Sequence, residues 1–286
     1  MEFIKGYMDD DHYRNLLCDM TQMIFGFTFE KWYRAGFYFG EYIPYSYVEN
    51  GKIIANASAN LMKIMHNGSK KFYIQIGTVM TRPEYRNRGL ASELIQMILY
   101  DYNDLADGFY LFGNLNAVDF YKKIGFKRLD QWRWHWDHPA KRDTKVSPFV
   151  PAGEKMREEY VRLLNRAVCN AEFDHLNRCS LQMFYTMDME NVYYCKGLDC
   201  FSVMHSENRV LYLDSVISSR ELEISDVTAR IEEDYEKIVF GFTPRMKDHL
   251  SAERYDGNDD YRFFYLGTSL ECIEKEKLYF PVMSHA

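Results

Sequence analysis

The sequence predicts an α/β (α+β) protein in which a mixed central sheet is flanked by helices, and in which this arrangement is duplicated in tandem. Three observations support this fold class. A short apolar strand over residues 72–79 runs into a glycine-bearing loop and an amphipathic helix. A second strand, at 109–112, is followed by a short helix that ends at a glycine. After residue 150 the same order of elements recurs faintly. Alternation of strands and helices of this kind is typical of a helix-flanked sheet.

The first elements are a helix and a hairpin. Apolar residues recur on one side of an expected helix from about residue 9 to 25. Two strands follow, at roughly 42–48 and 52–64. Residues 49–51 join them, and the Asn-Gly pair in this turn is a strong hairpin signal. We therefore expect an antiparallel pair ahead of the strand at 72–79.

The helix after the loop is expected over residues 90–102. Its apolar residues lie at helical spacing along one stripe: Leu90, Leu94, Ile95, Ile98, Leu99 and Tyr102. Polar residues lie largely off this stripe, so the stripe should face the core. The first turn of the helix is then held in place by packing.

The loop over residues 81–91 has the features of a phosphate site. The first backbone N–H groups of a helix lack intrahelical partners and carry the positive end of the helix dipole. Gly89 and Ala91 keep this approach free of bulk, and Arg86 and Arg88 add positive charge. The short pattern R-x-x-G-x-A also arises by chance, so an ordinary loop is the alternative for the isolated motif.

A second motif lies downstream of the strand at 109–112. It has the form N-x-x-A-x-x-F-Y-x-K-x-G-F and consists of Asn114, Ala117, Phe120, Tyr121, Lys123, Gly125 and Phe126. In this order and at this separation, the two motifs resemble those of the GNAT family of acyl-CoA-dependent N-acyltransferases. The loop resembles the family's V-x-P-x-x-R-x-x-G-x-A segment, with Thr81 where Val is usual. The resemblance covers roughly residues 1–140.

The resemblance implies that acetyl-CoA is the co-substrate. The backbone amides at the loop would hold its pyrophosphate, the open strand edge at 79–81 would pair with its pantetheine arm, and Asn114 would contact that arm from the other wall. The residues expected to bind acetyl-CoA are Val79, Met80, Thr81, Arg86, Asn87, Arg88, Gly89, Leu90, Ala91, Ser92, Asn114, Ala117 and Tyr121.

The resemblance also implies direct attack of an amine on the thioester, with Tyr121 as the general acid for the leaving thiolate. The alternative for Tyr121 is aromatic packing, in a chain with 23 Tyr and 20 Phe. Many family members carry a Glu on the strand before the loop, but residues 73–79 contain no carboxylate. Glu41 is the candidate base from a neighbouring segment, and a solvated surface carboxylate is its alternative. In the resembling tandem-domain aminoglycoside acetyltransferases the C-terminal carboxylate is the base, which here belongs to Ala286.

The length of 286 residues predicts two domains, 1–140 and 150–286, separated by a polar, proline-containing linker at 137–148. The first would be the catalytic, acetyl-CoA-binding domain. The second would be an accessory domain that shapes or covers the acceptor site.

The second half is expected to repeat the first in degenerate form. Its predicted elements are a helix at 154–169, a strand pair at 193–204 and 209–216, a short helical stretch to 231 and a strand at 237–242. The arginine- and glycine-bearing loop has no counterpart, because residues 218–223 replace it. An unrelated α+β domain is the alternative.

Composition restricts the classes of partner. With 35 basic and 42 acidic residues the formal charge is −7, which gives no basic field for nucleic acid. A cationic acceptor is compatible with this charge. The alternating Trp132–His138 run could stack bases, but a strand that packs its tryptophans on the core fits the pattern better. No apolar run or leader suggests a membrane or export, and the unpatterned cysteines, including Cys195 and Cys200, predict reduced thiols and no metal site.

Together these features predict a cytoplasmic N-acetyltransferase that moves an acetyl group from acetyl-CoA to a primary amine of a small molecule or a peptide. They predict no nucleic-acid or membrane partner and are compatible with an oligomer. The alternative from another class is a non-catalytic CoA- or acyl-CoA-binding regulatory protein.

Overall fold

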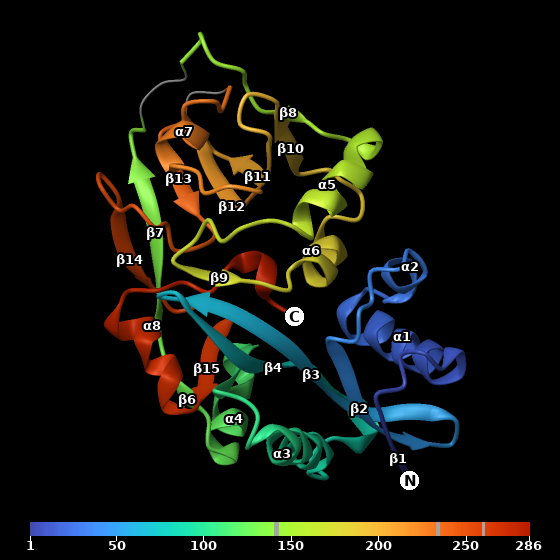
Figure 1. Cartoon of the computed structure of the whole chain (residues 1–286). Helices are drawn as coiled ribbons and strands as arrows, with labels where there is room; N and C mark the ends of the chain where they lie inside the picture. Colours follow the sequence, from blue (N-terminus) through green and yellow to red (C-terminus); the bar gives the residue numbers. More distant parts are fainter. Residues whose placement is uncertain (140–142, 233–234, 259–260) are drawn as a thin grey trace.

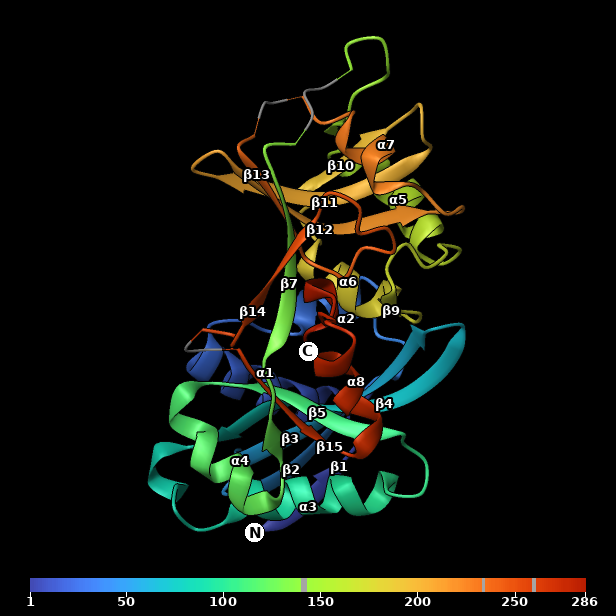
Figure 2. The same cartoon turned by 90° about the vertical axis from the view of Figure 1, so that its left-hand side faces the viewer.

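Two β-sheets form the frame of the protein, one in each half (Figure 1). The computed structural model describes residues 1–139, 143–232, 235–258 and 261–286. The chain ends in the middle of the molecule, between the two halves, as both views show (Figures 1 and 2).

The two sheets have matching strand orders. The first sheet runs, in order of pairing, β1 (Glu2–Lys5), β2 (Tyr42–Glu49), β3 (Lys52–His66), β4 (Ser69–Thr81), β5 (Gly108–Gly113), β15 (Arg262–Leu266) and β6 (Lys127–Arg128), with β9 (Phe173–His175) paired to β3. The second runs β8 (Val150–Pro151), β10 (Val192–Cys195), β11 (Cys200–Glu207), β12 (Val210–Ser218), β13 (Lys237–Phe240), β7 (Gln131–Asp137) and β14 (Ser251–Tyr255).

Strands cross between the halves in both directions: the second half supplies β15 and β9 to the first sheet, and the first half supplies β7 to the second sheet. β15 lies between β5 and β6 in the first sheet, and β7 occupies the corresponding place between β13 and β14 in the second. β7 can be followed in Figure 2 as it leaves the lower half for the upper one. The division at 140–150 stays a prediction, but neither sheet is complete without a strand from across it. Residues 140–142 of the expected linker lie outside the described residues.

The helices surround and separate the sheets. Their bounds are α1 (Asp11–Phe25), α2 (Glu30–Arg34), α3 (Leu90–Tyr102), α4 (Val118–Ile124), α5 (Arg157–Leu164), α6 (Cys179–Tyr185), α7 (Ile224–Thr228) and α8 (Cys272–Lys275). One core packs the α3 stripe on the first sheet, through residues such as Leu94, Ile98 and Ile76. Another core joins the halves, because Leu17 and Trp32 of α1 and α2 cluster with Met183 of α6. No described helix is long and apolar enough to cross a membrane.

The elements expected in the first half are confirmed. Helix α3 has the predicted bounds, and α1, β4 and β5 differ from the expected segments by only a few residues at their ends. The hairpin turn has positive φ at both central positions, 51° at Asn50 and 69° at Gly51, as a two-residue hairpin turn requires. Helix α4 ends at Gly125, whose φ of 110° lies in the left-handed region.

Two expectations for the second half are wrong in detail. The helix predicted for 154–169 stops at Leu164, where the Asn165 side chain donates to the Val161 carbonyl and satisfies an otherwise unpaired helix end. The strand predicted for 193–204 is a hairpin of β10 and β11, because the chain reverses at residues 196–199 with Asp199 at φ 50°. Gly197 in this turn was the available signal.

The strand of tryptophans packs as predicted at two positions. Trp134 is buried in the core of the second sheet and Trp136 packs against the same core. Trp132 instead lies beneath the cationic groups of Arg254 and Lys277. Cys195 and Cys200 are buried free thiols that face each other across the β10–β11 hairpin. Among the described residues no group of three His, Cys, Asp or Glu side chains could hold a metal ion.

Candidate active site

The start of α3 is open to solvent and has no side-chain cap. Gly89 is the N-cap residue with φ 82°, in the left-handed region, and an added Cβ there would meet nothing within 4 Å. Residues 86–89 are exposed, whereas Leu90 is buried and anchors the first turn. The backbone N–H groups of this turn are therefore free to face an anion.

Hydrogen bonds hold the loop before α3 against strands β2 and β3 of the first sheet. Arg82 donates from Nε to the Ile53 carbonyl at 2.7 Å, and Tyr85 donates to Glu49 at 2.7 Å. The Arg88 guanidinium lies over the Tyr85 ring, 4.7 Å from its centroid. Arg86 donates to the Thr81 carbonyl at 3.3 Å. These contacts hold the loop in place while leaving its glycine exposed.

Strand β4 carries a bulge just before the loop. Its register with β3 shifts between Asn56 and Ser58, and Thr78 has φ 42°, which is rare for a β-branched residue. Asn56 donates from Nδ2 to the Thr78 carbonyl at 2.8 Å, in place of a strand partner. The hydroxyls of Thr78, Ser58 and Tyr42 form a closed triangle with sides of 2.7 to 2.8 Å. This buried network stabilises the strained backbone.

Beyond the bulge β4 separates from its parallel neighbour. Pairing with β5 covers only Tyr73, Ile74 and Gln75, so the edge of β4 from Ile76 onward has no partner in β5. Residues 76–81 instead line a cavity of about 690 Å³, a volume in the usual range for small-molecule sites. The exposed edge can accept an extended chain as an added strand.

Both halves line this cavity. The first half contributes Val79, Met80, Thr81, Ala91, Asn114, Ala117 and Tyr121 from β4, α3, α4 and the connection before it. The second half contributes His175, Asn177, Ser180, Leu181, Phe184, Tyr185, Tyr261, His285 and Ala286. Sequence reasoning missed a cluster of aromatic residues at the cavity that comes from 25–32 and α6. The signal was the Phe25, Phe27, Phe29 and Trp32 run, whose first three members alternate with the period of a strand although the chain forms no strand there.

Tyr121 is buried at the cavity wall. Its ring packs on Phe264 and Phe126, and a Cβ at Gly113 would come within 2.8 Å of the ring. Burial raises the pKa of the Tyr121 phenol to about 12. The hydroxyl therefore keeps its proton at neutral pH, as a general acid must.

The carboxylate of Glu41 and the main chain of Ala286 reach the cavity. Glu41 lines it, and its Oε2 atom is buried with no hydrogen-bond partner among the described residues. An oxygen of Ala286 accepts a hydrogen bond from Gln75 Nε2 at 3.0 Å. A Cβ at Gly77 would come within 2.9 Å of that oxygen, so Gly77 permits the approach. Tyr185 donates to the His285 carbonyl and ties the tail to α6.

The two histidines at the cavity are neutral. Burial lowers the pKa of His175 to about 3, with a further contribution from the nearby Arg178, and burial lowers the pKa of His285 to about 3. His285 stacks on Phe112 with ring centroids 3.7 Å apart. Neither imidazole carries charge near neutral pH, and no lysine or arginine is among the described residues that line the cavity.

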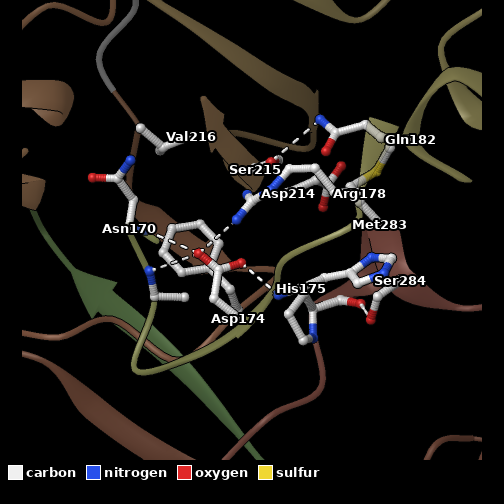
Figure 3. Close-up of a pocket in the computed structure, with 13 residues that line it drawn as sticks. Asn170, Asp174, His175, Arg178, Gln182, Asp214, Ser215, Val216, Met283 and Ser284 are labelled. Carbon is white, nitrogen blue, oxygen red and sulfur yellow. Dashed lines mark hydrogen bonds and ion pairs between the residues drawn. The ribbon is translucent and has the colours of Figure 1, made fainter. Parts of the chain in front are cut away.

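A much smaller polar pocket of about 20 Å³ adjoins the cavity at His175 (Figure 3). It has room for about one water molecule. Asp174 and Arg178 form a buried ion pair there at 3.0 Å, and Asp174 also accepts from the backbone N–H groups of Asn170 and Ala171. The pair joins β9 to the start of α6 and so positions the α6 wall of the cavity.

The structure brings together only part of the residue set expected from the sequence. Glu41, Val79, Met80, Thr81, Ala91, Asn114, Ala117 and Tyr121 line the one cavity. Arg86, Asn87, Arg88, Gly89, Leu90 and Ser92 do not line it and lie in the loop or first turn of α3. Ala91, in that first turn, connects the two groups.

Comparison with known proteins finds a family for the first half. Residues 9–126 match the model of the acetyltransferase (GNAT) family. No curated protein sequence matches the chain.

Solved structures resemble the chain over nearly its whole length. A GCN5-related N-acetyltransferase from Kribbella flavida is 16% identical, with a TM-score of 0.57 over 92% of this chain and 70% of its own. A probable N-acyltransferase from Enterococcus faecalis V583 is 13% identical, with a TM-score of 0.54 over 94% and 73%. A GCN5-related N-acetyltransferase from Anabaena variabilis is 14% identical, with a TM-score of 0.54 over 92% and 72%. At these identities the likeness concerns the fold. The open start of α3 and the separation of β4 from β5 lie within the matched segment, so residues 9–126 match a GNAT acetyltransferase domain in both sequence and fold.

Proposed function

We propose that the protein transfers an acetyl group from acetyl-CoA to a primary amine by direct attack. The observation that carries the proposal is that Tyr121, Glu41 and the unpaired edge of β4 share one cavity. An acid, a carboxylate and a site for an extended acyl carrier are the parts that this reaction needs.

The residues present fit acetyl-CoA. The uncapped N–H groups after Gly89 would receive the pyrophosphate, with Arg86 and Arg88 as nearby cations. The edge formed by Val79, Met80 and Thr81 would hydrogen-bond the pantetheine amides, and Asn114 and Ala117 would contact it from the other side. Bound in this way, acetyl-CoA supplies a thioester carbonyl to the cavity.

The transfer follows from these positions. The amine nitrogen attacks the thioester carbon, a C–N bond forms, and the C–S bond then breaks. The departing thiolate takes its proton from the Tyr121 hydroxyl, while the proton lost by the amine goes to a carboxylate. Glu41 is our candidate for that carboxylate, because it is the one acidic side chain among the described residues that line the cavity.

One variant tests the base. Glu41→Gln removes the carboxylate and keeps the side-chain shape. Loss of kcat with an unchanged acetyl-CoA affinity would identify Glu41 as the base, and an unchanged kcat would exclude it.

We propose that residues 1–140 are the catalytic part and that residues 150–286 are a degenerate copy of the same fold that covers the acceptor site. Two observations support the copy. β12 and β13 are parallel, as β4 and β5 are, and the strand orders of the two sheets correspond. The stretch before α7 holds Glu221 and Glu223 and no glycine, so it offers no phosphate site.

A screen of primary amines with detection of free CoA thiol tests the proposal. Amine-dependent thiol release, with formation of the N-acetylated amine, is the expected result. Tight acetyl-CoA binding without release for any amine would instead identify a CoA-binding regulatory protein.

A further inference from the structure

We propose that the acceptor is a primary amine carried on an apolar body, an alkyl or aryl group, and not a polyamine or an amino sugar. The inference rests on the proposed acetyl transfer and names the class of amine that this cavity selects.

Aromatic rings form a continuous wall of the cavity. Phe29 lies 5.2 Å from Phe27, 5.8 Å from Phe184 and 6.0 Å from Trp32, centroid to centroid. Phe27 and Phe184 are 5.4 Å apart. The two halves therefore build this wall together, because Phe184 belongs to α6 and the other three rings to residues 27–32. We call these four residues the aromatic wall.

Tyr42 connects the aromatic wall to the bulge in β4, beside which we propose that the transfer occurs. The Tyr42 ring is 4.7 Å from Phe29, and its hydroxyl bonds to Thr78 at the β4 bulge. An acceptor whose nitrogen approaches the β4 edge would therefore place its remaining atoms along the rings. Burial of apolar atoms against the rings lowers the free energy of binding. Hydroxyl groups would instead lose their hydrogen bonds to water and find no partner on the rings.

The charges at the cavity favour a single cation. Glu41 Oε2 is buried without a hydrogen-bond partner among the described residues, no described lysine or arginine lines the cavity, and both lining histidines are neutral near pH 7. A protonated amine can approach Glu41 and the faces of the rings. A second ammonium further along the molecule would lie against Phe27 and Phe184 without a carboxylate of its own, since Glu41 is the one acidic side chain among the described residues that line the cavity.

A matched pair of amines tests the inference. Hexylamine and 1,5-diaminopentane have the same number of non-hydrogen atoms and differ in a terminal methyl or ammonium group. We expect kcat/KM for hexylamine to exceed that for the diamine by at least about tenfold, and to rise roughly fourfold per methylene from propylamine to hexylamine. Equal or higher kcat/KM for the diamine would overturn the inference.

A variant of the aromatic wall locates the selectivity. Phe184→Ala should lower kcat/KM for hexylamine by about tenfold or more and change that for propylamine little, while Tyr100→Ala, at an exposed position of α3 away from the cavity, should leave both unchanged. A loss of equal size for both amines in Phe184→Ala would overturn the assignment of the wall.

Failure of the proposed function has a different signature. If no amine releases CoA while acetyl-CoA still binds, acetyl transfer is excluded but the cavity can be tested directly. Calorimetry of hexylamine and 1,5-diaminopentane with the CoA-bound protein should then still show tighter binding of hexylamine. Tighter or equal binding of the diamine would overturn the inference by itself.

Discussion

Tyr121 is the single side chain on which the proposed chemistry depends most. Tyr121→Phe keeps the ring against Gly113 and Phe264 and removes the proton. We expect kcat to fall by about 10²- to 10⁴-fold with little change in acetyl-CoA affinity, measured by calorimetry. Unchanged kcat, with an amine whose chemical step limits the rate, would assign Tyr121 to packing alone.

The pH profile gives an independent test of the same residue. Because burial raises the pKa of Tyr121 to about 12, the phenol stays protonated until the pH approaches that value. We therefore expect kcat to show no fall up to about pH 10, while it rises as the bound amine loses its proton. A descending limb near pH 8 in the wild-type protein, absent from Tyr121→Phe, would contradict this pKa.

Gly89 offers a matched pair of variants at the phosphate loop. Asp and Asn have similar size and both tolerate the left-handed φ of 82° better than other side chains. Gly89→Asp also adds a negative charge where the pyrophosphate should lie. We expect Gly89→Asp to weaken acetyl-CoA binding at least about tenfold more than Gly89→Asn, by calorimetry. Equal affinities in the two variants would mean that the anion binds elsewhere.

At the scale of the elements, the bulge in β4 is what opens the sheet, and Asn56 is its main support. Asn56→Leu removes the donor to the partly buried Thr78 carbonyl. We expect the free energy of unfolding to fall by about 1–3 kcal/mol and acetyl-CoA to bind more weakly.

Tyr7→Phe is the control for this variant. It removes a buried hydroxyl from the far end of the same network, 2.6 Å from Ser46 and without contact to Thr78. We expect Tyr7→Phe to lower the free energy of unfolding less than Asn56→Leu does and to leave acetyl-CoA affinity unchanged. An equal loss of affinity in both variants would show that general destabilisation, not the bulge, sets binding.

Local pattern was sufficient to predict most of the first half. The stripe from Leu90 to Tyr102, the Asn50-Gly51 turn and the stop at Gly125 are short-range signals, and the helix and strands they predict are present. The expectation for 193–204 failed because its apolar run hides a turn at Gly197. Gly197 is the local signal of the reversal, because a glycine inside an expected strand indicates an interruption of that strand.

The cavity was only partly predictable for a different reason. Val79, Asn114 and Tyr121 lie in recognisable motifs near one another in the sequence. Phe184 and Ala286 reach the same cavity through tertiary packing, which periodicity does not record. The exchange of β7 and β15 between the sheets is likewise a long-range pairing with no local signal.

At the scale of the whole molecule, the two halves resemble each other in strand order but differ in their capacity for a nucleotide. Helix α7 has five residues, and Glu221 and Glu223 precede it. We therefore expect one acetyl-CoA per chain by calorimetric titration, and none in Gly89→Asp at concentrations that saturate the wild-type protein. Two equivalent binding sites would mean that the second half retains a phosphate site.

We propose that the acetyl group passes directly from acetyl-CoA to the amine inside a cavity that both halves line. A single-turnover experiment tests it: the protein saturated with acetyl-CoA is mixed with hexylamine, quenched at short times and measured by mass spectrometry for both the small molecules and the intact chain. The account predicts that N-acetylhexylamine and free CoA form together, one of each per chain, with no acetylated protein at any time. Accumulation of an acetylated chain, or intact acetyl-CoA at all times with every amine tried, would contradict it.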